Sequence, residues 1–241
     1  MSTARRRSGW WPAGRSATRR HEFGAAFEPG ERWEAVWVGE EKRGFLRRTV
    51  MAEDTGPITV EQRLAIMSQG EISWLTSTVW VADVDDFPWY RYEITVGFRP
   101  PVVWLRHGDT LTCEGVTVET AGFPLPTFGA YPAVVSMPFD EGAVVEMTRL
   151  FDTGGIVDEE AALVSTGWDE VEIGGEQQPL WRVDLYAGGQ LSASFWMDAV
   201  RHLRLSDWKG AMLSPTPVSE VLDGFPQDMV LLAAGTRGSL R

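Results

Sequence analysis

Apolar and polar residues alternate in short runs along most of this chain. From about residue 31 onward, runs rich in Val, Ile, Thr and aromatic residues are separated by clusters of Gly, Pro or Asp, which is the pattern of strands and turns. The predicted strands are residues 32–38, 44–52, 58–68, 72–82, 89–98, 101–107, 110–120, 133–137, 143–150, 180–187, 191–198 and 201–208. This pattern predicts an all-β protein with few short helices, either an antiparallel β-barrel or a strongly curved half-barrel sheet.

The residue patterns of two of these strands predict which of their faces are buried. In residues 89–98, apolar side chains occupy the even-numbered positions from Tyr90 to Phe98, and polar side chains alternate with them. That period of two predicts one face on the core. In residues 72–82, Trp74 and Trp80 share one face while the opposite face is also apolar, so both faces look sheltered. Such a strand needs either a covering helix or a filled barrel interior.

The segments between the strands are less regular. Residues 121–132 hold three prolines among apolar side chains, which excludes a central strand and predicts a long connection across an end of the sheet. Such a connection could cover the mouth of a barrel. Residues 154–170 read as the best helical or loop stretch, and a short helix is predicted at about 217–222.

Length and composition favour one folded domain. With 241 residues, 44% of them hydrophobic, the chain can build one sizeable core, which we assign to residues 23–241. Residues 1–22 are rich in arginine and predict a disordered basic arm or an over-extended start, with a nucleic-acid or membrane tether as the alternative. The chain has neither an apolar signal-peptide core nor a run of about 18 apolar residues. We therefore expect a cytoplasmic protein without stable membrane insertion.

Charge narrows the range of partners. The first 20 residues contain six of the 22 basic side chains and no acid, so the rest of the chain holds 16 basic and 34 acidic groups, a net charge of about −18. A body this acidic repels phosphate, so we expect no nucleic-acid partner and favour neutral or cationic small molecules. Cys113 is the single cysteine, which excludes an internal disulfide and predicts a small buried hydrophobe.

The sequence offers few candidates for catalysis. It contains no GxSxG, GxxxxGK[ST], GxGxxG or HExxH motif, and we predict neither a cofactor nor a metal. The three histidines are 86 and 95 residues apart, which disfavours a shared metal site. His107 ends an apolar strand beside Trp104, and it is either a surface residue or a general acid or base at a pocket mouth. His202 is the weaker candidate of the same kind.

Tryptophan is the most specific signal in the composition. The chain has 12 tryptophans, and pairs at even spacing, such as Trp33 with Trp37 and Trp74 with Trp80, lie on one face of a strand. We expect most of the tryptophans to be residues of the hydrophobic core, because aromatic side chains bury large areas in β proteins. The alternative is a pocket for a flat or long apolar ligand, or for a cation held by cation–π attraction.

Two stretches carry a resemblance to known proteins. The early GERWEAVWVGEEKRG stretch, with Trp33, Val36, Trp37, Gly39 and Gly44, and the late WRVDLYAGG and FWMDAVRHLRLSDWKG stretches resemble uncharacterised bacterial one-domain β proteins of the lipoprotein-carrier and lipocalin-like half-barrel type. The resemblance implies a wide curved antiparallel sheet around a hydrophobic cavity, often in the periplasm.

Three functions are compatible with these features. The first is binding of a hydrophobic or aromatic small molecule in a tryptophan-lined barrel pocket. The second is a cofactor-independent isomerase, cyclase or hydrolyase of bacterial secondary metabolism, in which the same pocket shapes an apolar substrate and His107 with a nearby carboxylate moves a proton. The third is an interaction protein that uses exposed aromatic side chains. The sequence leaves the identity of the ligand and the oligomeric state open. The candidate wall residues are Trp74, Trp80, Tyr92, Trp104 and Trp196.

Overall fold

The structure is one large, curled β-sheet with three short α-helices and a 3₁₀ turn among its described residues. It is a computed structural model that describes residues 27–52, 57–81, 89–120, 123–150 and 157–235. The arginine-rich arm predicted for residues 1–22 lies outside the described residues. The strands are β1 (Gly30–Val38), β2 (Glu41–Ala52), β3 (Ile58–Ser68), β4 (Glu71–Val81), β5 (Trp89–Val96), β6 (Val102–His107), β7 (Thr110–Cys113), β8 (Val116–Glu119), β9 (Phe123–Pro126), β10 (Val144–Leu150), β11 (Val157–Ile173), β12 (Glu176–Ala187), β13 (Gln190–Met197), β14 (Leu203–Trp208) and β15 (Ala211–Pro215).

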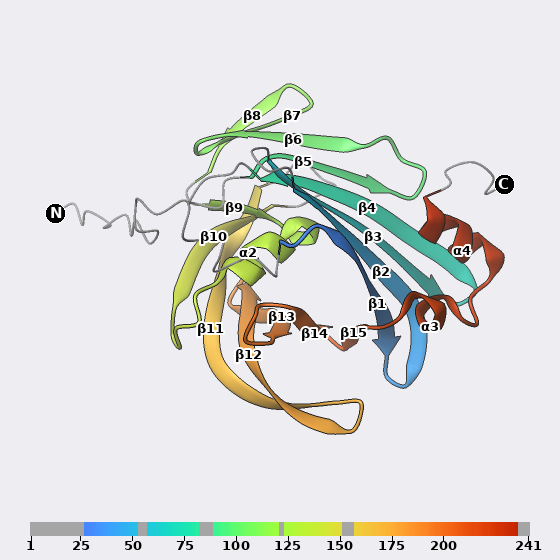
Figure 1. Cartoon of the computed structure of the whole chain (residues 1–241). Coiled ribbons are helices and arrows are strands. Elements are labelled where there is room, and N and C mark those ends of the chain that lie inside the picture. Colours follow the sequence, from blue (N-terminus) through green and yellow to red (C-terminus); the bar gives the residue numbers. More distant parts are fainter. Residues whose placement is uncertain (1–26, 53–56, 82–88, 121–122, 151–156, 236–241) are drawn as a thin grey trace.

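The sheet has 15 strands in the order β8-β7-β6-β5-β4-β3-β2-β1-β15-β14-β13-β12-β11-β10-β9. Neighbouring strands pair antiparallel, except that β9 runs parallel to β10. The strands from β1 to β8 therefore form one continuous meander, those from β10 to β15 form a second, and the pairing of β1 with β15 joins the two. Strands β8 and β9 are the two edges, so the described sheet curls without closing (Figure 1). The half-barrel form of the predicted all-β fold is confirmed.

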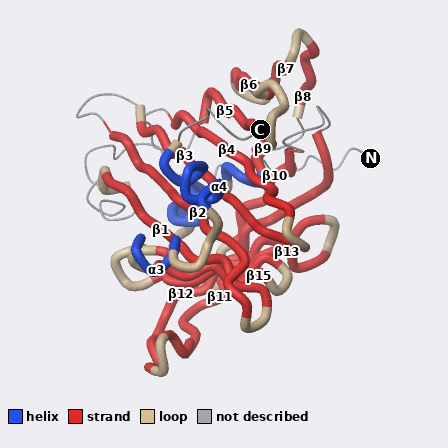
Figure 2. The backbone as a smooth tube through the Cα atoms, turned by 90° about the vertical axis from the view of Figure 1, so that its right-hand side faces the viewer, coloured by secondary structure: helices blue, strands red, loops and turns tan. Residues whose placement is uncertain are grey.

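The helices lie on both sides of the sheet. Helix α2 (Tyr131–Ser136) lies inside the curl, next to the 3₁₀ turn η1 (Thr127–Gly129) (Figure 1). On the outer side, α3 (Val218–Leu222) packs on β1 and β2, and α4 (Gln227–Ala234) packs on β3 (Figure 2). Within the described residues, none of the helices has the length and apolar character needed to cross a membrane.

Most predicted strands are confirmed, and β3 spans the predicted residues 58–68. Two predictions were wrong. Residues 133–137 were predicted as a strand but belong largely to α2, where Pro132 occupies the first turn, a position that suits its fixed φ angle. Residues 154–170 were predicted as a helix or loop, whereas 157–173 form β11, the longest strand. The predicted strand 110–120 divides into β7 and β8 at Glu114 and Gly115, whose positive φ angles fit a two-residue hairpin turn.

One glycine permits the close approach of two neighbouring strands. Gly44 of β2 pairs with Ile66 of β3, and a Cβ atom at position 44 would lie 2.1 Å from the backbone oxygen of Ala65. Backbone atoms in the middle of a ladder cannot move as a flexible side chain does. Glycine at position 44 is therefore a steric requirement of the β2–β3 pairing.

We predict that Gly44→Ala lowers the free energy of unfolding by about 3 kcal/mol, because it overpacks the ladder. Urea denaturation measures this change. Gly39→Ala is the matched control, since Gly39 lies in the preceding turn at φ +62° with open space around its Cα. In the control, the free energy of unfolding should fall by only about 1–2 kcal/mol, which is the cost of placing alanine in the left-handed region. Equal losses in the two variants would contradict the steric explanation.

Candidate functional site

The concave face of the sheet is covered by a short piece of the chain itself. We call residues 123–137, which comprise β9, η1 and α2, the plug. Every residue of α2 is buried, and the large apolar cluster of the protein forms around the plug from both halves of the sheet. The plug carries no charged residue. Residues 121–132 were predicted to cross an end of the sheet, whereas α2, which begins at Tyr131, lies inside the curl (Figure 1).

Polar side chains hold the plug by its backbone. The Ser77 hydroxyl donates to the carbonyl oxygen of Phe128 at 2.9 Å, and the Gln62 amide donates to the same oxygen. At the other end, Arg201 donates to the carbonyl oxygens of Val135 and Met137 at 3.0 and 2.5 Å. These bonds pair three carbonyl groups of the plug with side-chain donors of the sheet and its turns.

A polar belt crosses the concave face beneath the plug. The belt consists of Glu34, Arg48, Gln62 and Ser77, from four neighbouring strands. Arg48 forms an ion pair with Glu34, and both side chains are almost fully buried. The guanidinium of Arg48 also lies 4.0 Å from the ring centroid of Tyr131, within the range of cation–π attraction.

Tyr131 joins the plug to this belt. Its hydroxyl oxygen accepts a hydrogen bond of 2.9 Å from Arg32. Burial raises the pKa of the Tyr131 hydroxyl, while the nearby guanidinium groups of Arg48 and Arg32 act in the opposite direction. The neutral phenol is therefore the form that the burial of the plug favours.

A second apolar surface begins on the other side of the belt. Its residues lie on the same face of the strands as the belt, two positions along the chain from it. Val36 comes two residues after Glu34 in β1, and Leu64 comes two residues after Gln62 in β3. Three of its members, Leu64, Ile66 and Trp208, are only partly buried. We call this surface the apolar patch, and its residues are Val36, Leu46, Leu64, Ile66, Trp208 and Leu213. The concave face is thus apolar at both ends with a polar belt between them.

The five aromatic residues predicted to line a pocket do not share one surface. Tyr92 and Trp104 pair across β5 and β6 and are fully buried in the concave core, beside the plug cluster. Within the described part of the chain, the indole N–H of Trp104 has no acceptor. Trp74, Trp80 and Trp196 alternate with concave residues and lie on the outer face.

The three outer tryptophans have separate surroundings. Trp74 packs with the cluster beneath α3 and α4 and meets Phe98 edge to face. Trp80 lies under the guanidinium of Arg91, at 4.7 Å from its ring centroid. Trp196 donates its indole N–H to Asp169 at 3.1 Å. The three tryptophans therefore make separate local contacts and do not line one shared pocket.

The two histidines in the described residues lie at or beside turns between strands. His107 ends β6, is exposed, and pairs with Thr110 across a tight turn. His202 lies 3.3 Å from Asp198 in the turn before β14. Among the described residues, His, Cys, Asp and Glu side chains form no group of three or more that could hold a metal ion.

The residues that organise the concave face were not among the sequence candidates. Glu34 and Arg48 belong to strands whose neighbouring positions on the same face are apolar, such as Val36 and Val50. A charged residue at a core-facing position was the available signal, because charge is rarely buried without a partner. The sequence alone did not say which face was concave.

We predict that Arg48→Met lowers the free energy of unfolding by about 3–5 kcal/mol, because it leaves Glu34 buried without a counter-charge. The double variant Glu34→Leu with Arg48→Met removes both charges and should be more stable than Arg48→Met alone. Urea denaturation of the wild type, both single variants and the double variant forms a double-mutant cycle. Additive losses would contradict the direct coupling.

Comparison with known proteins supports the fold and leaves the function open. No family model and no curated protein matches the sequence. Among solved structures, the chain is similar to a β-barrel-like protein from Brucella abortus, of the domain of unknown function DUF1849, with a TM-score of 0.53. The sequence identity is 8%, and the match covers 79% of this chain and 95% of the other. The two proteins share a curved all-β fold.

Proposed function

We propose that this chain binds a hydrophobic small molecule on the concave face of its half-barrel. The observation that carries the proposal is the apolar patch, in which Leu64, Ile66 and Trp208 remain partly exposed on a concave surface that continues beneath the plug. An apolar ligand that covers these side chains gains about 25 cal/mol for each Å² removed from water.

The plug has the chemistry of such a ligand. It is uncharged, it packs on apolar side chains from both halves of the sheet, and it is held by hydrogen bonds to its backbone. A ligand that starts on the apolar patch extends along the concave face by taking the place of the plug. Only an apolar molecule can do so without leaving the surrounding apolar surface uncovered.

The polar belt limits the shape of the ligand. Glu34 and Arg48 satisfy each other, so the belt offers a neutral polar surface between two apolar ones. A long apolar molecule with a polar group part-way along or at its end fits this order. Of the sequence candidates, Tyr92 and Trp104 line the plug end of this path, whereas Trp74, Trp80 and Trp196 lie on the outer face.

The first test measures binding of the fluorescent probe N-phenyl-1-naphthylamine and its displacement by palmitate. Ile66→Glu places a charge on the apolar patch and should weaken both affinities by about tenfold or more. Val116→Glu is the matched control, because Val116 is 61% exposed and lies on the edge strand β8, outside the apolar patch. Equal affinities for the wild type and Ile66→Glu would sink the proposal. Native mass spectrometry followed by denaturing extraction then identifies any molecule that copurifies.

A second prediction concerns the plug. Ser77→Ala and Arg201→Ala each remove hydrogen bonds to plug carbonyls, so each raises the population in which the plug has moved away. If that population binds the probe, both variants should bind it up to about tenfold more tightly. Arg204→Ala is the control, because among the described residues Arg204 pairs with Asp198, at 4.0 Å, and not with the plug. An unchanged or weaker affinity in both variants would show that the ligand does not replace the plug.

A further inference from the structure

The outer face of β2 to β5 carries a groove, on the side of the sheet opposite the plug. Its volume is about 370 Å³, within the range of roughly 300–1,000 Å³ that is common for small-molecule sites. Its lining is polar except for one tryptophan and one methionine. The lining residues are Met51, Thr59, Glu61, Arg63, Thr76, Thr78, Trp80, Glu93 and Thr95.

The register of the strands arranges these side chains in rows. The middle row is Glu61, Thr78 and Glu93, which pair directly across β3, β4 and β5. Because strands are about 4.8 Å apart, the two glutamates flank Thr78 at a backbone separation of roughly 10 Å. On either side of this row lie Trp80 and Thr76 of the same strand.

Internal ion pairs already balance the charges of the groove. Arg63 lies 3.5 Å from Glu61, and Arg91, which covers Trp80, lies 3.0 Å from Glu93. The two carboxylates and two guanidiniums leave no net charge. A groove of this kind has no excess charge with which to select a phosphate or a polyamine, and a neutral polar ligand fits it best.

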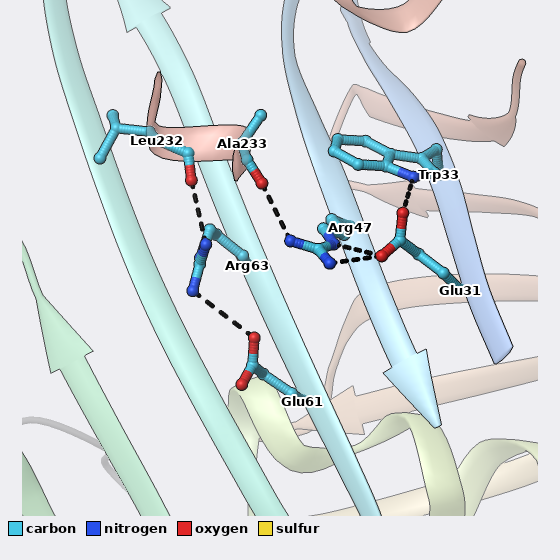
Figure 3. Close-up of polar contacts among 7 residues, drawn as sticks. All are labelled: Glu31, Trp33, Arg47, Glu61, Arg63, Leu232 and Ala233. Carbon is cyan, nitrogen blue, oxygen red and sulfur yellow. Dashed lines mark hydrogen bonds and ion pairs between the residues drawn. The ribbon is translucent and has the colours of Figure 1, made fainter. Parts of the chain in front are cut away.

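Arg63 is also fixed in place by helix α4. Its guanidinium donates to the carbonyl oxygen of Leu232 at 3.1 Å, and its neighbour Arg47 donates to the carbonyl oxygen of Ala233 at 3.0 Å (Figure 3). The same Arg63 side chain donates to the hydroxyl of Thr76 at 3.4 Å. This end of the groove is therefore preorganised, which reduces the entropy lost when a ligand binds.

The hydrogen-bonding groups that remain match a polyhydroxylated molecule. Within the described residues, the hydroxyls of Thr59, Thr78 and Thr95 make no hydrogen bond. A hydroxyl both donates and accepts, and carboxylates accept, so the floor offers donors and acceptors side by side. Trp80 adds an apolar ring at the edge of this floor. A sugar ring has the same combination of hydroxyl edges and apolar C–H faces.

We propose that this groove is a saccharide-binding site that takes one or two neutral sugar units. Thr78 and the flanking carboxylates of Glu61 and Glu93 hold the hydroxyl groups, and Trp80 contacts the C–H face. The site is independent of the hydrophobic site proposed on the concave face, because the two lie on opposite faces of the sheet.

The test is saturation-transfer-difference NMR of the full chain with glucose, galactose, maltose, cellobiose and trehalose, followed by titration of each sugar that gives a signal. We expect at least one disaccharide to bind. Thr78→Val removes one hydroxyl without changing the shape of the side chain, and Trp80→Ala removes the ring. Each variant should raise the Kd by about threefold to tenfold.

The controls are matched by residue type. Thr148→Val on β10 and Trp196→Ala on β13 lie outside the groove and should leave the Kd unchanged. If Trp80→Ala does not fold, the Kd of Thr78→Val alone tests the proposal. The proposal is overturned if none of the five sugars binds, if binding survives Thr78→Val undiminished, or if putrescine or glucose 6-phosphate binds more tightly than the neutral sugars. None of these variants should alter the affinity for N-phenyl-1-naphthylamine.

Discussion

The fold depends on one constraint, which is that an open, strongly curled sheet exposes an apolar concave face that must be covered. A closed barrel would cover it with side chains from all sides, but here the described edges β8 and β9 do not pair with each other. The plug supplies the missing cover and buries all of α2 against both halves of the sheet. The belt of Glu34, Arg48, Gln62 and Ser77 sets where the plug ends, and the apolar patch lies beyond it.

Local alternation predicted the strands well, since a half-buried strand has the same period wherever it lies. It failed where tertiary context decides. Residues 133–137 contain β-branched side chains typical of a strand, but inside the curl they have no partner strand, and a helix satisfies their backbone within the segment. Conversely, the acidic and alanine-rich start of β11 resembles a helix, but pairing with both β10 and β12 makes it a strand.

The aromatic candidates illustrate a second limit of the sequence. The alternation placed Trp74 and Trp80 correctly on one face of β4, opposite Leu75 and Val79. The alternation could not identify this face as the outer one. Helices α3 and α4 cover part of the outer face, so Trp74 packs in an apolar cluster as a core residue does. The polar belt was missed because the sequence does not show which strands pair. Only the pairing of β1 with β2 brings Glu34 and Arg48 together as a buried ion pair.

The central claim is that the plug occupies the place of a hydrophobic ligand. Hydrogen–deuterium exchange of the backbone amides of Val134 and Met137, measured with and without saturating palmitate, tests it directly. Both amides are hydrogen-bonded within the plug, the first to Ala130 and the second to Val134. The account predicts that palmitate accelerates their exchange, because the ligand moves the plug out of the concave face. Exchange that stays equally slow, or becomes slower, while palmitate is bound would contradict it.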